Sequence, residues 1–135
     1  MLSTFWCNEV LRLAYTVNTT TTFYVGISST MPNSDGSNLN EPSGGNYTRM
    51  PITGFNAPSG GRVTNANTIT FPTSTAEWFP AANTAAYYVI FDGADSSANV
   101  LGSGAFYTPM EIGENASLVI AAGLLSISLV DRPDD

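Results

Sequence analysis

The chain has neither histidine nor lysine, and its only cysteine is Cys7. Nucleophilic catalysis by a Ser-His-Asp triad or by a Ser-Lys pair is therefore excluded. One cysteine allows no disulfide within the chain and no cysteine-based zinc site. We expect Cys7 to be a small apolar residue on the buried face of a helix, and we consider a reactive thiol the less favoured interpretation.

Charged residues make up only 11% of the chain, against about a quarter in a typical globular protein. Four arginines are outnumbered by eleven carboxylates, which gives a net charge of -7. This charge prevents binding to a nucleic-acid backbone by counterion release and opposes docking on an anionic membrane. The sequence has no apolar run near the ~20 residues that cross a bilayer, and no signal-peptide pattern. We expect synthesis in a reducing cytoplasm, and neither nucleic acid nor membrane as a partner.

The carboxylates form no evident catalytic or metal-binding pattern. Most lie beside turn residues, and nothing in the sequence orients two of them across a cleft, as a glycosidase requires. Segments 33–38 and 92–95 resemble fragments of calcium loops, but neither has the alternating oxygen ligands and closing glutamate of an EF-hand. We interpret both as Asx turns. The sequence therefore predicts no catalytic residue, no cofactor and no metal site, and we expect a protein that is not an enzyme.

Residues 2–16 are predicted to form one short α-helix. Apolar side chains recur there at spacings of three and four, which places them in one stripe along the helix. The stripe covers either the domain's own core, which is the favoured alternative, or a partner. Its members are Leu2, Phe5, Trp6, Val10, Leu13, Ala14 and Val17.

From residue 23 onward the sequence predicts β-structure. Short runs of β-formers are separated by turns rich in glycine and proline, including two Pro-Ser-Gly-Gly turns at 42–45 and 58–61. Residues 121–123 are predicted to reverse the chain between the last two strands. The predicted strands are 23–28, 47–52, 68–71, 86–91, 100–106, 117–120 and 124–129.

These elements predict a mainly β fold in a single domain, 1–135. We expect an antiparallel β-sandwich, or a small jelly-roll-like barrel, of about seven to eight strands over 23–129. The short N-terminal helix precedes it, and an acidic, frayed tail follows at 131–135.

The aromatic residues give two further hypotheses. Trp78 and Phe79 lie in a long predicted loop, 73–84, so they must pack against something. Tyr47, Tyr88 and Tyr107 are candidates for a platform on which sugar rings stack, although a structural use of these rings is favoured. Tyr87 and Tyr88 are adjacent on a predicted strand, so they should point to opposite faces.

Several segments, in a fixed order, resemble a family of small phage virion proteins described as tail fibre proteins. The resemblance runs from the predicted helix to residue 129. Relatives have a lysine near position 108 and a histidine or other polar residue near 87–88, whereas this chain has neither lysine nor histidine. The matching segments are FYVGI at 23–27, EPSGGNYTR at 41–49, TNANTITFPTSTAEW at 64–78, IFD at 90–92, LGSGA at 101–105 and GLLSISL at 123–129.

The resemblance implies a virion structural protein, made in the host bacterial cytoplasm, that acts by protein–protein contacts. It would be a multi-copy part of the tail, fibre or collar apparatus, or a decoration of the capsid surface. Its partners would be other virion proteins and copies of itself, with a trimer favoured. Large apolar anchors dominate interfaces, so the candidate contact residues are Phe5, Trp6, Val10, Trp78 and Phe79. The alternative from another class is an adhesin domain that binds a host-surface glycan.

Overall fold

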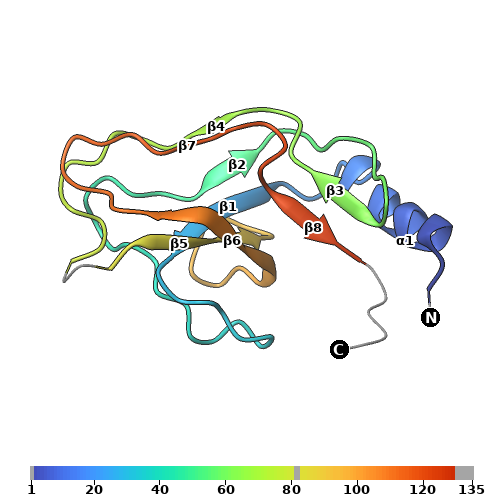
Figure 1. Ribbon diagram of the computed structural model, residues 1–135, viewed down its shortest axis with the longest axis horizontal. Coiled ribbons are helices and arrows are strands. Elements are labelled where there is room, and N and C mark those ends of the chain that lie inside the picture. The colour runs from blue at the N-terminus through green and yellow to red at the C-terminus, as the bar shows by residue number, and fades with distance from the viewer. Residues whose placement is uncertain (1, 81–82, 130–135) are drawn as a thin grey trace.

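The computed structural model describes residues 2–80 and 83–129, and it shows a mainly β protein that begins with a short helical segment (Figure 1). The α-helix α1 (Thr4–Leu11) continues directly into a π-helical turn, η1 (Arg12–Thr16). Eight strands follow. They are β1 (Phe23–Ser28), β2 (Met50–Ile52), β3 (Arg62–Thr64), β4 (Ile69–Thr70), β5 (Ala85–Phe91), β6 (Val100–Met110), β7 (Val119–Ile120) and β8 (Ser126–Ser128).

The strands form one four-stranded sheet and two short ladders, and every pairing is antiparallel. The sheet has the order β2-β1-β5-β6, so β6 is an edge strand. The ladders β3-β8 and β4-β7 lie together beside the sheet (Figure 1). Within the described ranges no pairing joins β6 to β7 or β8, so the strands do not close into a barrel. The prediction of a mainly β, antiparallel fold is confirmed, and the described strands form an open arrangement and not a closed barrel.

The core lies between one face of the sheet and the two ladders. Phe23, Val25 and Ile27 alternate along β1 and are buried, as the two-residue period of a strand requires. From β5, Tyr88 and Ile90 join them. The ladder side contributes Ile69, Phe71, Leu118, Ile120 and Leu125 to the same cluster.

The second Pro-Ser-Gly-Gly turn is a tight hairpin. Gly60 and Gly61 have positive φ angles, 63° and 74°, which two-residue hairpin turns of this kind need and glycine adopts without strain. Ser59 and Arg62 exchange two backbone hydrogen bonds across it, 2.9 and 3.1 Å long. The chain then enters β3, a three-residue strand that the sequence analysis did not predict.

The first Pro-Ser-Gly-Gly turn is an anchor for a distant loop. The carbonyl oxygen of Gly45 accepts hydrogen bonds from the backbone N–H of Thr75, at 3.0 Å, and from Nε1 of Trp78, at 2.8 Å. Trp78 is therefore held at its polar end while its ring packs edge-on against Tyr47 and Phe71. This contact joins the two segments that carry most of the family resemblance.

The predicted reversal between the last two strands needs a correction. The chain does turn at residues 121–124, but β7 pairs with β4 and β8 pairs with β3, so the two strands are not hairpin partners. The bend is held by Asn65, which is fully buried. Its Oδ1 accepts from the backbone N–H groups of Gly123 and Leu125, at 3.0 and 2.9 Å, and its Nδ2 donates to the carbonyl of Ala121.

The remaining strands lie where they are expected, with shifted ends. β1 matches its predicted range, and β5 and β6 contain theirs. The strands β2, β4, β7 and β8 are shorter than predicted. The predicted tail at 131–135 lies outside the described residues.

Candidate assembly surfaces

The first candidate surface is the outer side of the N-terminal helical segment. Ser3 caps the helix by accepting a hydrogen bond from the backbone N–H of Trp6, at 3.1 Å. Beyond this cap, five large apolar side chains point to solvent, and we call them the helical face. Phe5 is 72% exposed and Trp6 is 52% exposed. The face consists of Leu2, Phe5, Trp6, Leu13 and Val17.

The opposite side of the segment holds it on the domain. Cys7 and Leu11 are buried, at 1% and 3% exposure. Oδ1 of Asn8 accepts a hydrogen bond from the backbone N–H of Gly61 in the hairpin before β3, at 2.7 Å. Tyr15 in η1 packs against Phe23 with 4.9 Å between ring centroids. The expected buried position of Cys7 is confirmed.

The favoured expectation for the apolar stripe is therefore wrong. The stripe was expected to cover the domain's own core, but its largest members form the exposed helical face. Val10 and Ala14 are half-buried at its margin. The segment is apolar on both sides, and the smaller inner side, Cys7 and Leu11, is the one that packs on the domain.

One ion pair lies within the exposed side of the segment. Arg12 donates to both carboxylate oxygens of Glu9, at 3.1 and 3.0 Å. These hydrogen bonds lower the pKa of Glu9 and raise the pKa of Arg12. The pair leaves the helical face without net charge.

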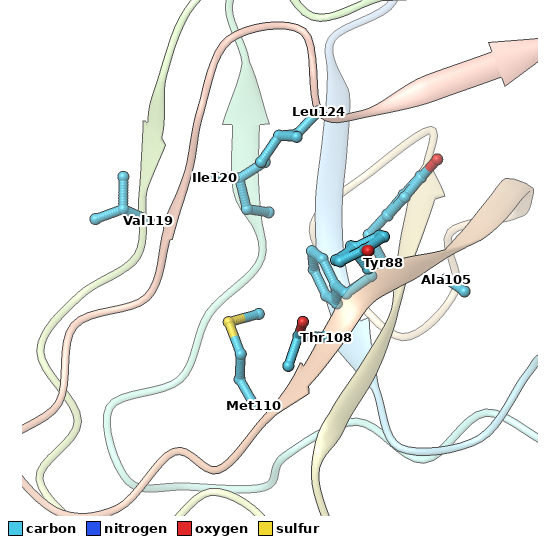
Figure 2. Close-up of a pocket in the computed structure, with 9 residues that line it drawn as sticks. Tyr88, Ala105, Thr108, Met110, Val119, Ile120 and Leu124 are labelled. Atoms are coloured by element: carbon cyan, nitrogen blue, oxygen red, sulfur yellow. The ribbon is translucent and has the colours of Figure 1, made fainter.

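The second candidate surface is a groove between β6 and the β7–β8 corner, which we call the β6–β7 groove. It has a volume of about 260 Å³. Figure 2 shows Thr108 and Met110 on one side of the hollow, Ile120 and Leu124 on the other, and Tyr88 at one end. In the described part of the chain, no charged side chain lines it. The lining is completed by Ala105, Phe106, Tyr107 and Val119.

Tyr88 forms the inner wall of the groove and links the sheet to β8. Its hydroxyl donates to the carbonyl of Ser126, at 2.9 Å, and accepts from the backbone N–H of the same residue, at 3.1 Å. Its ring meets Phe106 edge-on, with 5.7 Å between centroids. Tyr107 is fully exposed at the rim, and Val119 and Leu124 are about half exposed there.

The structure places Trp78 and Phe79 in the core, each at 3% exposure. The aromatic pair in the predicted loop therefore packs inside the domain, and its side chains offer no surface to a partner. Of the five candidate contact residues, Phe5 and Trp6 are exposed and Val10 is half-buried.

The three candidate tyrosines do not come together. Tyr88 and Tyr107 line the β6–β7 groove, whereas Tyr47 belongs to a half-buried polar network. The Tyr47 hydroxyl donates to Glu41 at 2.5 Å and accepts from the backbone N–H of Ile27 at 3.2 Å. Burial, and then the negative charge of Glu41, raise the pKa of Tyr47. Tyr87 and Tyr88 do point to opposite faces, since only Tyr88 joins the core.

Arg49 completes this network. It forms an ion pair with Glu41, 2.6 Å long, and donates to the carbonyl of Asp95 at 2.7 Å. Its guanidinium lies 3.5 Å from the ring centroid of Phe91. Glu41, Tyr47 and Arg49 all come from the EPSGGNYTR segment, so this part of the resemblance forms a half-buried tie between segments of the fold.

The acidic segments form turns. Asp35 accepts hydrogen bonds from the backbone N–H and hydroxyl of Ser37, and Asp95 does the same for Ser97, which confirms both Asx turns. Across residues 2–80 and 83–129, no group of three or more acidic or cysteine side chains is placed to hold a metal ion. No helix in that part of the chain has the length and apolar character to cross a membrane.

The sequence analysis missed the groove, although one signal pointed to it. Leu124 and Leu125 are adjacent, so an extended chain must turn one of them outward. Leu125 is buried at 1% exposure and Leu124 reaches the groove rim at 58%. The helical face was seen as a stripe, but its outward direction was not predicted.

Comparison with known families identifies the family of this chain. The model of the family described as podophage GP4 fiber I protein gp80 matches residues 1–128. A comparison with curated proteins finds no match. A match over this share of the chain shows that the protein belongs to the podophage GP4 fiber I protein gp80 family, and that it is a phage virion protein of the tail-fibre type.

Proposed function

We propose that the protein is a small multi-copy assembly module of the fibre apparatus, which binds copies of itself and other virion proteins. The observation that carries the proposal is the helical face. A contiguous apolar patch of a few hundred Å² is about the largest that a monomeric soluble protein exposes, and such a patch often marks a binding site. Here Phe5 and Trp6 stand more than half exposed on a helix that is already anchored by its other side.

Binding, not chemistry, is the activity that these two surfaces favour. Within the described ranges, the groove is lined by aromatic, aliphatic and hydroxyl side chains, and the helical face carries only the neutralised Glu9–Arg12 pair. Such surfaces gain free energy when apolar area leaves water. They hold no free acid or base to move a proton, which supports a non-enzymatic role.

We propose a trimer as the assembled state and the tail fibre as the position. Membership of a fibre family supports the fibre over the collar or the capsid surface. A homo-oligomer with closed symmetry would place the same face of each copy in the same contact. Light scattering of the purified protein gives the copy number, and electron microscopy of labelled particles gives the position.

The helical face is tested by the double variant Phe5→Ala/Trp6→Ala. Both side chains are exposed in the single copy, so we expect thermal unfolding of the monomer within a few degrees of wild type. Anchors of this kind contribute about 2 kcal/mol or more to an interface, so the association constant should fall by more than tenfold. Sedimentation equilibrium measures the association. Met31→Ala, at a 60% exposed apolar residue outside the face, is the matched control.

An unchanged association constant in the double variant would rule out the helical face as the contact. Trp78→Ala provides the contrast, because it empties a core position. It should destabilise the fold itself by about 3–5 kcal/mol.

The alternative function is binding of a host-surface glycan. One observation favours it: Tyr107 is fully exposed at the rim of a groove that also presents the hydroxyl of Thr108. Sugars stack on such rings, but they also need several polar partners, and the groove offers few. A glycan array tests the hypothesis, with Tyr107→Ala as the control for specific binding. An array without a hit for the assembled wild-type protein would end it.

A further inference from the structure

The exposed large apolar side chains of the described residues gather at two places. Five form the helical face, and three, Tyr107, Val119 and Leu124, surround the β6–β7 groove. The other two, Met31 and Leu101, lie apart from both. One gathering is a convex helix and the other is a concave groove, and both are on the same chain.

We propose that the helical face of one copy docks into the β6–β7 groove of a second copy. The contact would join unlike surfaces, with Phe5 and Trp6 entering the hollow shown in Figure 2. This inference rests on the proposed function of self-assembly and names the two surfaces that meet.

The available area fits such a contact. The five side chains of the helical face are 46–72% exposed, which leaves roughly 500 Å² of apolar surface to cover. A stable interface buries about 800 Å² per partner, including its polar rim. In a contact between unlike surfaces, each copy of a closed ring takes part twice, once with its helix and once with its groove. In each of these contacts the helical face supplies most of the buried area, and polar atoms of the rim supply the rest.

The charges also favour this contact. Two copies, each with a net charge of -7, repel one another, so an interface between them is best formed where neither side carries a free charge. Among residues 2–80 and 83–129, no charged side chain lines the groove, and Glu9 and Arg12 neutralise each other beside the helical face. Docking would therefore desolvate no unpaired ion, which is the costly event in burying polar surfaces.

The aromatic rings at the groove provide a recognition geometry. Tyr107 is fully exposed at the rim, and Phe106 meets Tyr88 edge-on inside. A phenyl or indole ring that enters the groove can add further edge-to-face contacts with the rings of Phe106 and Tyr88, which are favourable beyond the area buried. Phe5 is the most exposed aromatic side chain of the helical face and is the natural entering group.

An extended strand is the competing occupant. The outer edges of β6 and β7 border the groove, and a strand could pair with either of them. The helix is favoured as the occupant because the largest group of exposed apolar side chains among the described residues, the five of the helical face, lies on the helical segment. Outside the groove rim, the described strands expose one large apolar side chain, Leu101.

The first experiment measures association of two single variants by sedimentation equilibrium. Phe5→Ala removes the entering ring, and Leu124→Lys places a charge on the opposite rim of the groove. Leu124 is 58% exposed, so the substitution leaves the core intact. We expect each variant to weaken association by tenfold or more, which is the usual loss at a central anchor. Met31→Lys adds the same charge outside both surfaces and should leave association unchanged.

The second experiment identifies the two surfaces directly. Leu13→Cys protein, which keeps Phe5 and Trp6, is mixed with Leu124→Cys protein under mild oxidation, while Cys7 stays buried. We expect a disulfide between the two variants, and none when Met31→Cys replaces Leu124→Cys. The product is recognised by mass spectrometry of the linked peptides.

The outcomes separate the inference from the proposed function. A wild-type protein that assembles, with both variants weakened and the mixed disulfide formed, supports the docking. If wild type assembles and only Phe5→Ala weakens association, the helical face contacts a surface other than the groove, such as the helical face of another copy or a strand-bearing partner. The groove inference is then overturned. If wild type remains a monomer at high concentration, self-assembly fails, and the inference fails with it.

Discussion

Arg49 is a single residue that holds three segments of the fold together. It pairs with Glu41 on the loop before β2, donates to carbonyls of Gly93 and Asp95 after β5, and lies over the ring of Phe91. Its side chain is only 8% exposed. Removing one partner of a buried pair leaves the other charge without compensation.

We therefore expect Arg49→Ala to lower the free energy of unfolding by about 3–5 kcal/mol. Urea denaturation followed by tryptophan fluorescence measures it. Arg62→Ala is the control, because Arg62 is exposed and its Nε has one hydrogen bond, to Ser128 Oγ at 3.2 Å. A loss below about 1 kcal/mol for Arg49→Ala would show that the network is only a surface pair.

A second prediction at this scale compares two glycines of β6. A Cβ at Gly104 would lie 2.8 Å from Cε2 of Tyr88, whereas a Cβ at Gly102 would meet no atom within 4 Å. Gly104→Ala should push Tyr88 from Ser126 and destabilise the fold by about 1–3 kcal/mol. Gly102→Ala should stay within about 1 kcal/mol of wild type, on either side. Thermal unfolding of both variants decides the point, and equal effects would contradict the close approach.

At the scale of elements, the connection between β5 and β6 depends on ionised aspartates. Asp92 accepts hydrogen bonds from the side chain and the backbone N–H of Asn99, at 2.9 and 2.7 Å. The side-chain hydrogen bond, and then the backbone one, lower the pKa of Asp92. The pKa of Asp95 is lowered in the same way by Ser97.

Because the pKa of Asp92 is lower in the folded state than in the unfolded state, the direction in which pH changes the stability is fixed. The stabilisation is fully present above the unfolded value, pH ~4, and it is lost as the pH falls through the lower folded value. We therefore expect Asp92→Ala to be less stable than wild type at pH 6, and the difference to shrink towards zero in strong acid. Urea denaturation across this pH range measures it. Glu114→Ala is the control, since that exposed carboxylate accepts no hydrogen bond from any residue in the described ranges.

The elements also show how far local sequence patterns reach. The run FYVGIS at β1 alternates and is rich in β-formers, so its limits could be predicted. β3 is three residues long, too short for any period to appear, and only its pairing with β8 makes it a strand. The helical stripe was visible, but its direction was not, because the segment is apolar on both sides and tertiary packing chooses between them.

At the scale of the whole molecule, the net charge of -7 gives a prediction for assembly. If uncharged surfaces join two like-charged copies, salt screens the repulsion and leaves the contact intact. Raising sodium chloride from low to moderate concentration should therefore strengthen association. Light scattering at several salt concentrations measures it. Association that weakens with salt would point to a contact made by ion pairs instead.

The groove belongs to this scale as well, and its origin explains why sequence patterns did not predict it. Its walls come from β5, β6 and the β7–β8 corner, which are far apart in the chain. These walls enclose a groove because, among the described strands, β6 pairs with neither β7 nor β8 along that side. No local period encodes a gap between strands, whereas the mainly β, antiparallel class follows from the strand patterns alone.

Because Cys7 is buried, the reactivity of this single thiol reports how often its helix opens away from the domain. At 1% exposure, the sulfur reacts with an alkylating reagent only while the helix lifts from the domain. The rate of alkylation therefore measures how often the helix opens, and no cysteine has to be introduced by mutation. If a neighbouring copy covers the helix, the openings become rarer, and a slower alkylation of Cys7 then reports how persistent the contact is.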